Sequence, residues 1–66
     1  MFVNYEITQR VLEVFFEEEI DHHSCLKLSL MIDDNIKKFS PQVVLFNFEK
    51  VTFMDSSGIG MLLRKV

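Results

Sequence analysis

The chain has 66 residues, a formal net charge of -3, and hydrophobic residues at 48% of its positions. A chain of this length forms one domain with a small core, because it buries only about 60% of the surface that its unfolded form exposes. The composition is too apolar for a disordered segment, and the seven scattered Lys and Arg residues argue against nucleic acid as a partner. The apolar runs are too short to cross a bilayer, and the N-terminus lacks a signal-peptide pattern. The single Cys25 cannot form an internal disulfide. We therefore expect a globular cytoplasmic protein with no membrane partner.

Two strands are predicted in the N-terminal segment. Residues 2–7 alternate between apolar and polar side chains, which is the period-2 pattern of a half-buried strand. Residues 8–10 form a predicted turn, and residues 11–16 (VLEVFF) form a second strand. The two strands are therefore expected to pair as an antiparallel hairpin. The acidic run at residues 17–19 is interpreted as a solvated strand end.

An amphipathic helix is predicted next. Residues 20–24 are interpreted as the loop that leads into it, with Asp21 or Ser24 as its N-cap. From Cys25 onward, apolar residues recur at spacings of three and four and define one helix face: Leu28, Ile32, Ile36 and Phe39. Three further residues are expected to widen this buried face: Leu26, Leu30 and Met31. The helix should end at Ser40, because the residue before a proline avoids the α region.

The last third of the chain predicts a third strand and a second helix. The apolar run at residues 43–48 suits a strand that is covered on both faces, as in a parallel or mixed α/β sheet. A helix is expected to start at residues 55–57, each of which is a good N-cap candidate. Gly58 and Gly60, the only two glycines of the chain, fall in its first turns and suggest that something approaches this backbone closely. The predicted fold is an α/β domain with a mixed sheet and the order β-β-α-β-α.

The second helix is predicted to continue through residues 64–66 without a C-cap glycine. Residues 1–66 are therefore interpreted as the N-terminal part of a single longer domain, truncated in the second helix. If the chain is stable alone, we expect it to bury its remaining apolar faces by self-association.

The segment Asp55-Ser56-Ser57-Gly58 has two interpretations. A serine at a helix N-terminus can simply cap the helix. It can also be a phosphorylation site, because free N–H groups and the positive end of the helix dipole hold a phosphate well. A nucleophile elbow is excluded because Met54 and Asp55, rather than glycines, lie two residues before the serines. A P-loop is excluded because Met61 follows Gly60.

Residues 21–25, Asp-His-His-Ser-Cys, contain potential metal ligands. His22 and Cys25 share a helix face at i, i+3, but the chain has no second ligand pair at zinc-site spacing. The alternative is a capped helix N-terminus, with Cys25 as a core residue. We predict no metal site.

These two segments together resemble a known family. Glu19-Ile20-Asp21-His22-His23 before the first helix, and Phe53 to Gly60 (FMDSSGIG) after the third strand, are similar to the STAS domain of bacterial anti-sigma factor antagonists, in particular to the sporulation branch that acts on sigma-F. The resemblance covers essentially the whole chain and implies the same order of elements.

The resemblance implies that the chain is a binding module and not an enzyme. A partner anti-sigma factor, a serine kinase of the GHKL ATPase type, would phosphorylate Ser57 and supply the ATP and magnesium, so that this chain needs no cofactor. Binding of the unphosphorylated chain would release the sigma factor, phosphorylation would weaken that binding, and a phosphatase would restore it. Asp55, Ser56 and Gly58 would shape the phosphorylation site. The expected partner-binding residues are Asp21, His22, His23 and Ile59.

Three alternatives stay open on the sequence alone. A STAS module of another signalling system, such as a stress scaffold or a transporter tail, would use the same segment without this cycle. A small hydrolase would pair Ser56 or Ser57 with His22 or His23, although no spacing supports it. The chain could also be an inactive truncated copy.

Overall fold

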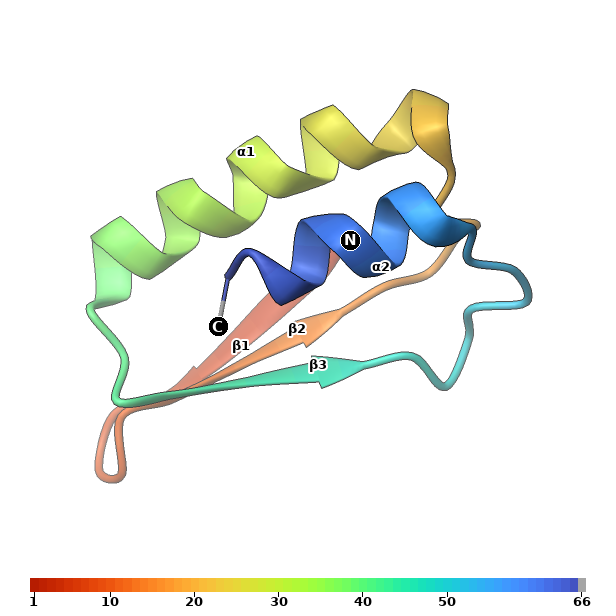
Figure 1. Cartoon of the computed structure of the whole chain (residues 1–66). Coiled ribbons are helices and arrows are strands. Elements are labelled where there is room, and N and C mark those ends of the chain that lie inside the picture. The colour runs from red at the N-terminus through yellow and green to blue at the C-terminus, as the bar shows by residue number, and fades with distance from the viewer. Residues whose placement is uncertain (66) are drawn as a thin grey trace.

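The structure is a computed structural model that describes residues 1–65 (Figure 1). It contains five elements in chain order: β1 (Phe2–Glu6), β2 (Val11–Phe15), α1 (His22–Phe39), β3 (Val43–Asn47) and α2 (Ser56–Leu63). The predicted order β-β-α-β-α and the α/β class are confirmed. Each strand ends one residue earlier than predicted, so that Ile7, Phe16 and Phe48 lie just beyond strand ends.

The three strands form one mixed sheet in the order β1-β2-β3. β1 and β2 pair in antiparallel register with Phe2 opposite Phe15, which confirms the predicted hairpin. The Glu6 carboxylate accepts hydrogen bonds from the backbone N–H groups of Thr8 and Gln9 and so closes the turn. β2 and β3 are parallel, and α1 is the crossover between them.

Both helices lie over the same face of the sheet (Figure 1). Between the sheet and the helices, apolar side chains from β2, the segment after it, α1 and α2 form one buried cluster: Leu12, Val14, Phe16, Ile20, Leu28, Ile32 and Met61. The apolar stripe predicted from the 3.6-residue period thus provides the α1 part of the core. Within residues 1–65, no helix is both long enough and apolar enough to span a membrane.

Two predictions about α1 are corrected. The helix begins at His22, within the segment predicted as a loop, because Asp21 caps it. Leu26 and Leu30 do not widen the buried face, since they are 70% and 57% exposed. Leu28 and Ile32 face the sheet. Leu26 and Leu30 lie on the side of the helix that is turned away from the sheet. Met31 is half-buried.

The expectation that β3 is covered on both faces is wrong for the described residues. Val43 and Leu45 are 44% and 50% exposed on the sheet face opposite the helices. No element within residues 1–65 covers that face, and β2 is the only strand paired with β3 among those residues.

The C-terminal end of α2 also differs from the prediction. The helix ends at Leu63, and the N–H of Arg64 donates to the carbonyls of Gly60 and Leu62. The Lys65 ammonium lies 2.7 Å from Ser29 Oγ and 2.8 Å from Asp33 Oδ1, so that it ties the end of α2 to the middle of α1. The predicted mid-helix residues 64 and 65 are therefore in a turn, and Val66 lies outside the described residues.

Candidate functional site

The two helices begin side by side because the segments before them are paired. Ile20 and Met54 form an isolated parallel bridge. The N–H of Ile20 donates to the Phe53 carbonyl at 3.0 Å, and the N–H of Asp55 donates to the Ile20 carbonyl at 3.1 Å. The residue after each bridge partner, Asp21 or Asp55, is the N-cap of a helix. Both helix N-termini therefore lie together at the end of the sheet where β2 and β3 finish (Figure 1).

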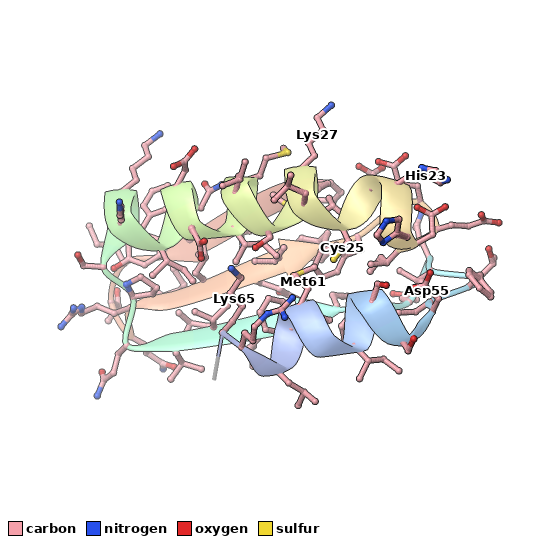
Figure 2. The ribbon with its side chains drawn as sticks, turned by 45° about the horizontal axis from the view of Figure 1, so that its top comes forward. His23, Cys25, Lys27, Asp55, Met61 and Lys65 are labelled. Carbon is pink, nitrogen blue, oxygen red and sulfur yellow. The ribbon has the colours of Figure 1, made fainter. Side chains whose placement is uncertain are left out.

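Asp55 caps both helices at once. Its Oδ1 accepts from the N–H groups of Ser57 and Gly58 at 2.9 and 3.1 Å, which satisfies the first turn of α2. Its Oδ2 accepts from the N–H of His22, the first residue of α1, at 3.1 Å. Figure 2 shows Asp55 at the start of α2, below the start of α1. One carboxylate thus fixes the position of the serine segment relative to α1.

Asp21 and Ser24 act together as the second cap. Asp21 Oδ1 accepts from the N–H groups of His23 and Ser24 at 2.9 and 3.0 Å, and the N–H of Asp21 donates to Ser24 Oγ at 3.1 Å. This is a capping box, so both of the predicted cap candidates take part. The hydrogen bond from the Ser24 N–H, followed by that from the His23 N–H, lowers the pKa of the Asp21 carboxyl below its usual 3.8.

The two glycines of α2 have different surroundings. Gly58 is buried, and a Cβ at this position would lie 2.7 Å from Ile20 Cγ2, 2.9 Å from Met54 Cγ and 3.2 Å from the Ile20 carbonyl oxygen. Gly60 has no atom within 4 Å of the corresponding position. The predicted close approach therefore holds at Gly58, where the paired Ile20–Met54 segment packs against the helix, and not at Gly60.

An open groove of about 470 Å³ runs between the N-terminal half of α1 and the length of α2. Ser57 lies half-buried in it, and the neighbouring Ser56 is exposed at its edge. The Cys25 thiol donates to the Ser57 carbonyl at 3.4 Å, and Met61 closes the floor (Figure 2). His22 also lines the groove, as its shared helix face with Cys25 suggested. Both helix dipoles present their positive ends at this end of the molecule, where the Asp21 and Asp55 carboxylates cap them.

The remaining predicted partner-binding residues lie outside this groove. Asp21 and His23 line a neighbouring hollow beside the acidic run, together with Glu18, Glu19 and Ser24. Ile59 is 51% exposed on another side of α2, where it borders an apolar hollow formed with Phe46, Phe48, Met54, Leu62 and Leu63. Only His22, of the four, shares the groove with Ser57.

Several residues of the groove were not assigned to the site from the sequence: Cys25, Leu26, Ser29 and Arg64. On α1 the lining positions recur at steps of three and four from His22. On α2 and its C-cap, the lining residues Ser57, Gly60, Met61 and Arg64 are also related by steps of three and four. This periodicity was available in the sequence, but it becomes informative only when the two helices are known to be neighbours.

A metal centre and a catalytic serine each need a particular arrangement of side chains. Residues 1–65 bring no three His, Cys, Asp or Glu side chains together at a distance that suits a metal ion. Within the same residues, neither serine hydroxyl hydrogen-bonds to His22 or His23, whereas a catalytic serine needs such a base.

The sequence of this chain is similar to those of two curated proteins. The chain is 30% identical over 61 residues to the anti-sigma F factor antagonist of Paenibacillus polymyxa, covering 92% of this chain and 52% of that protein. It is 28% identical over 60 residues to the anti-sigma F factor antagonist of Lysinibacillus sphaericus, covering 91% of this chain and 51% of that protein. The chain thus spans about half the length of these curated relatives.

Two solved structures have the same fold. The anti-sigma factor antagonist SpoIIAA in its unphosphorylated form matches with a TM-score of 0.68 and 29% identity, covering 97% of this chain and 59% of that one. The Bacillus cell fate determinant SpoIIAA in the phosphorylated form matches with a TM-score of 0.66 and the same 29% identity and coverage of 97% and 59%. The STAS domain family matches residues 2–66. The chain therefore belongs to the STAS domain family.

Proposed function

We propose that this chain is an anti-sigma factor antagonist whose binding to an anti-sigma serine kinase is switched off by phosphorylation of Ser57. Binding of the unphosphorylated chain displaces the sigma factor from the kinase. The chain performs no chemistry itself, and the kinase brings the ATP and magnesium. A phosphatase that acts on phosphorylated Ser57 resets the switch.

The geometry around Ser57 is the observation that carries the proposal. The residue stands in the first turn of α2, with its N–H fixed by Asp55 at 2.9 Å and its side chain half-buried in the groove. The serine is therefore partly accessible and is held at one position relative to both helices. The likeness to relatives named as anti-sigma F factor antagonists, and to SpoIIAA solved with and without phosphate, supports the assignment.

The same geometry explains how a phosphate would act. Phosphorylation adds about -1.5 to -2 charges and three acceptor oxygens at this position. The positive ends of the two helix dipoles offset part of that charge, in addition to the charge of the Asp55 and Asp21 carboxylates that already cap them. A partner surface that accommodates the neutral hydroxyl beside the Asp55 carboxylate would meet a much more negative site. The switch can therefore act by repulsion at the interface, without a change of fold.

Self-association is part of the same proposal. Large apolar side chains remain exposed away from the groove, including Leu45 at 50% and Leu63 at 67%. A second copy that packs on the apolar hollow beside β3 would cover Leu63 without covering Ser57, because that hollow shares no lining residue with the groove.

A competition experiment tests the proposed function. The chain is titrated into the complex of the Paenibacillus polymyxa anti-sigma F factor with its sigma factor, and the released sigma factor is measured. We expect release by the wild type and by Ser57→Ala, and at least tenfold weaker release by Ser57→Asp. Gln9→Glu is the control, because it adds the same charge in the exposed turn between β1 and β2, away from both helix N-termini. Equal potency of Ser57→Asp and the wild type would contradict the switch.

A further inference from the structure

We propose that Leu26 and Leu30, on the outer side of α1, form a second contact for the kinase that phosphorylates Ser57. This proposal rests on the proposed function and names the surface through which the partner holds the chain while Ser57 reacts. These two residues are called the leucine pair below. The partner it fits is a kinase with an apolar patch beside its phosphoryl-transfer site.

The exposure of the leucine pair is the first observation. Leu26 is 70% exposed and Leu30 is 57% exposed, although leucine is among the residues most often buried. Single exposed apolar residues are common and need no explanation, but these two lie at i and i+4 and therefore stack on one side of the helix. They form one continuous apolar surface about a helical turn long.

The second observation is that this surface is continuous with the Ser57 groove. Leu26 lines the groove together with Ser57, and Leu30 follows one turn further along α1. A stable protein–protein contact covers about 800 Å² on each partner, which is roughly a sixth of the 4706 Å² surface described here. A kinase that covers Ser57 over such an area extends across the groove wall and over the leucine pair.

The surroundings have the form of an interface rim. His23, Lys27 and Asp34 lie on neighbouring positions of α1 and are all exposed. An apolar centre with a charged and polar border is the usual composition of a docking surface. The apolar hollow beside β3 does not compete for this role, because none of its lining residues belongs to the Ser57 groove.

Phosphorylation kinetics test the role of the leucine pair. The variants are Leu26→Gln, Leu30→Gln and the double variant, because glutamine has nearly the helix propensity of leucine and removes only the apolar contact. Initial rates of Ser57 phosphorylation by the Paenibacillus polymyxa anti-sigma F factor are measured by intact mass. We expect KM to rise about tenfold for each substitution, with kcat unchanged, as for loss of an apolar anchor in binding.

Two controls keep the test specific. Leu45→Gln removes a leucine that is 50% exposed on the far face of the sheet, and its KM should equal that of the wild type. The double Leu26→Met, Leu30→Met variant keeps the apolar surface and should retain the wild-type KM. Thermal unfolding of each variant checks that the fold is unchanged.

The outcomes separate this inference from the function on which it rests. If the double glutamine variant has the wild-type KM while Ser57→Ala is not phosphorylated, the leucine pair is not a contact and the proposed function stands. If Leu45→Gln raises KM as much as the double variant does, the leucine pair has no special role either. If the wild type itself gains no phosphate, the proposed function fails and this inference fails with it.

Discussion

Asp55 is the residue on which the geometry of the site depends most. Its carboxylate accepts three backbone hydrogen bonds, two from the first turn of α2 and one from His22 of α1. The two oxygens therefore serve different helices. Losing the carboxylate would leave N–H groups unpaired at two helix ends and free the serine segment from α1.

The free energy of unfolding of Asp55 variants should show that this residue caps two helices. An N-cap substitution by alanine typically costs about 1 kcal/mol for one helix, so Asp55→Ala should lower the free energy of unfolding by about 2 kcal/mol. Asp55→Asn keeps an acceptor oxygen and should cost less. Urea unfolding gives the values, with Asp34→Ala, an exposed mid-helix site, as the control. A loss at Asp55→Ala no larger than at Asp34→Ala would refute the shared cap.

The two glycines of α2 should respond with opposite signs. Gly58→Ala forces a methyl group against Ile20 and Met54, and overpacking of this kind costs about 1–3 kcal/mol. Gly60→Ala meets no atom within 4 Å and should raise the free energy of unfolding by about 0.5–1 kcal/mol through helix propensity alone. Thermal or urea unfolding of the two variants side by side checks this. A similar effect of both would show that the close approach at Gly58 does not limit the fold.

The sequence was only partly informative about these capping contacts. It offered Asp21 or Ser24 as the cap of α1 and any of residues 55–57 as the cap of α2, because residue type alone does not choose among neighbouring candidates. It could not show that Asp55 also reaches His22, which lies 33 residues earlier in the chain. That contact depends on the Ile20–Met54 bridge, and an isolated bridge has no pattern of its own in the sequence.

The stability of α1 should depend on pH through its N-cap. The pKa of Asp21 is lowered by the hydrogen bonds it accepts, so the folded protein holds this proton less tightly than the unfolded chain does. The stabilisation is fully present above the ordinary value of 3.8 and is lost as the pH falls through the lowered pKa. The capping box should therefore weaken in the acid range below about 3.8.

A comparison of Asp21→Asn with the wild type tests this dependence. Asparagine also caps helices well but carries no titrating proton. Between neutral pH and the acid range, the wild type should lose more unfolding free energy than Asp21→Asn does. Circular dichroism at 222 nm during urea unfolding, repeated at several pH values, gives both curves. Parallel curves for the two proteins would show that the Asp21 carboxylate does not carry this effect.

The elements themselves were largely predictable from periodicity. The alternation in residues 2–7 and the stripe of Leu28 and Ile32 each identified an element and its buried face. The same stripe argument failed at Leu26 and Leu30, because periodicity does not tell how much of a helix the neighbouring layers cover. The sheet and α2 bury only part of α1, and the two leucines stay outside that contact.

For the whole molecule, the exposed apolar surface is the property with the clearest consequence. β3 has one strand neighbour within residues 1–65, and Phe46, Phe48, Ile59, Leu62 and Leu63 border an apolar hollow beside it. An unpaired strand edge next to apolar side chains favours association with another chain. The run at residues 43–48 predicted a strand with apolar faces but could not show how much of it the chain covers.

Sedimentation velocity should therefore show self-association that increases with protein concentration. Leu63→Lys places a charge at a side chain that is 67% exposed beside the hollow and should shift the protein to the monomer. Ile7→Lys is the control, because Ile7 is 77% exposed but isolated in the turn between β1 and β2. A wild-type chain that stays monomeric at every concentration would show that the apolar surface does not drive association.

The proposed function depends on Ser57 being the residue that a kinase modifies. The most direct measurement is the intact mass of the chain after incubation with the Paenibacillus polymyxa anti-sigma F factor and Mg-ATP, followed by mapping of the modified residue. The antagonist of that organism, present in the same tube, is the positive control. We expect one added phosphate on Ser57, absent in Ser57→Ala and retained in Ser56→Ala. A phosphate on Ser56, or none while the control is phosphorylated, would contradict this expectation.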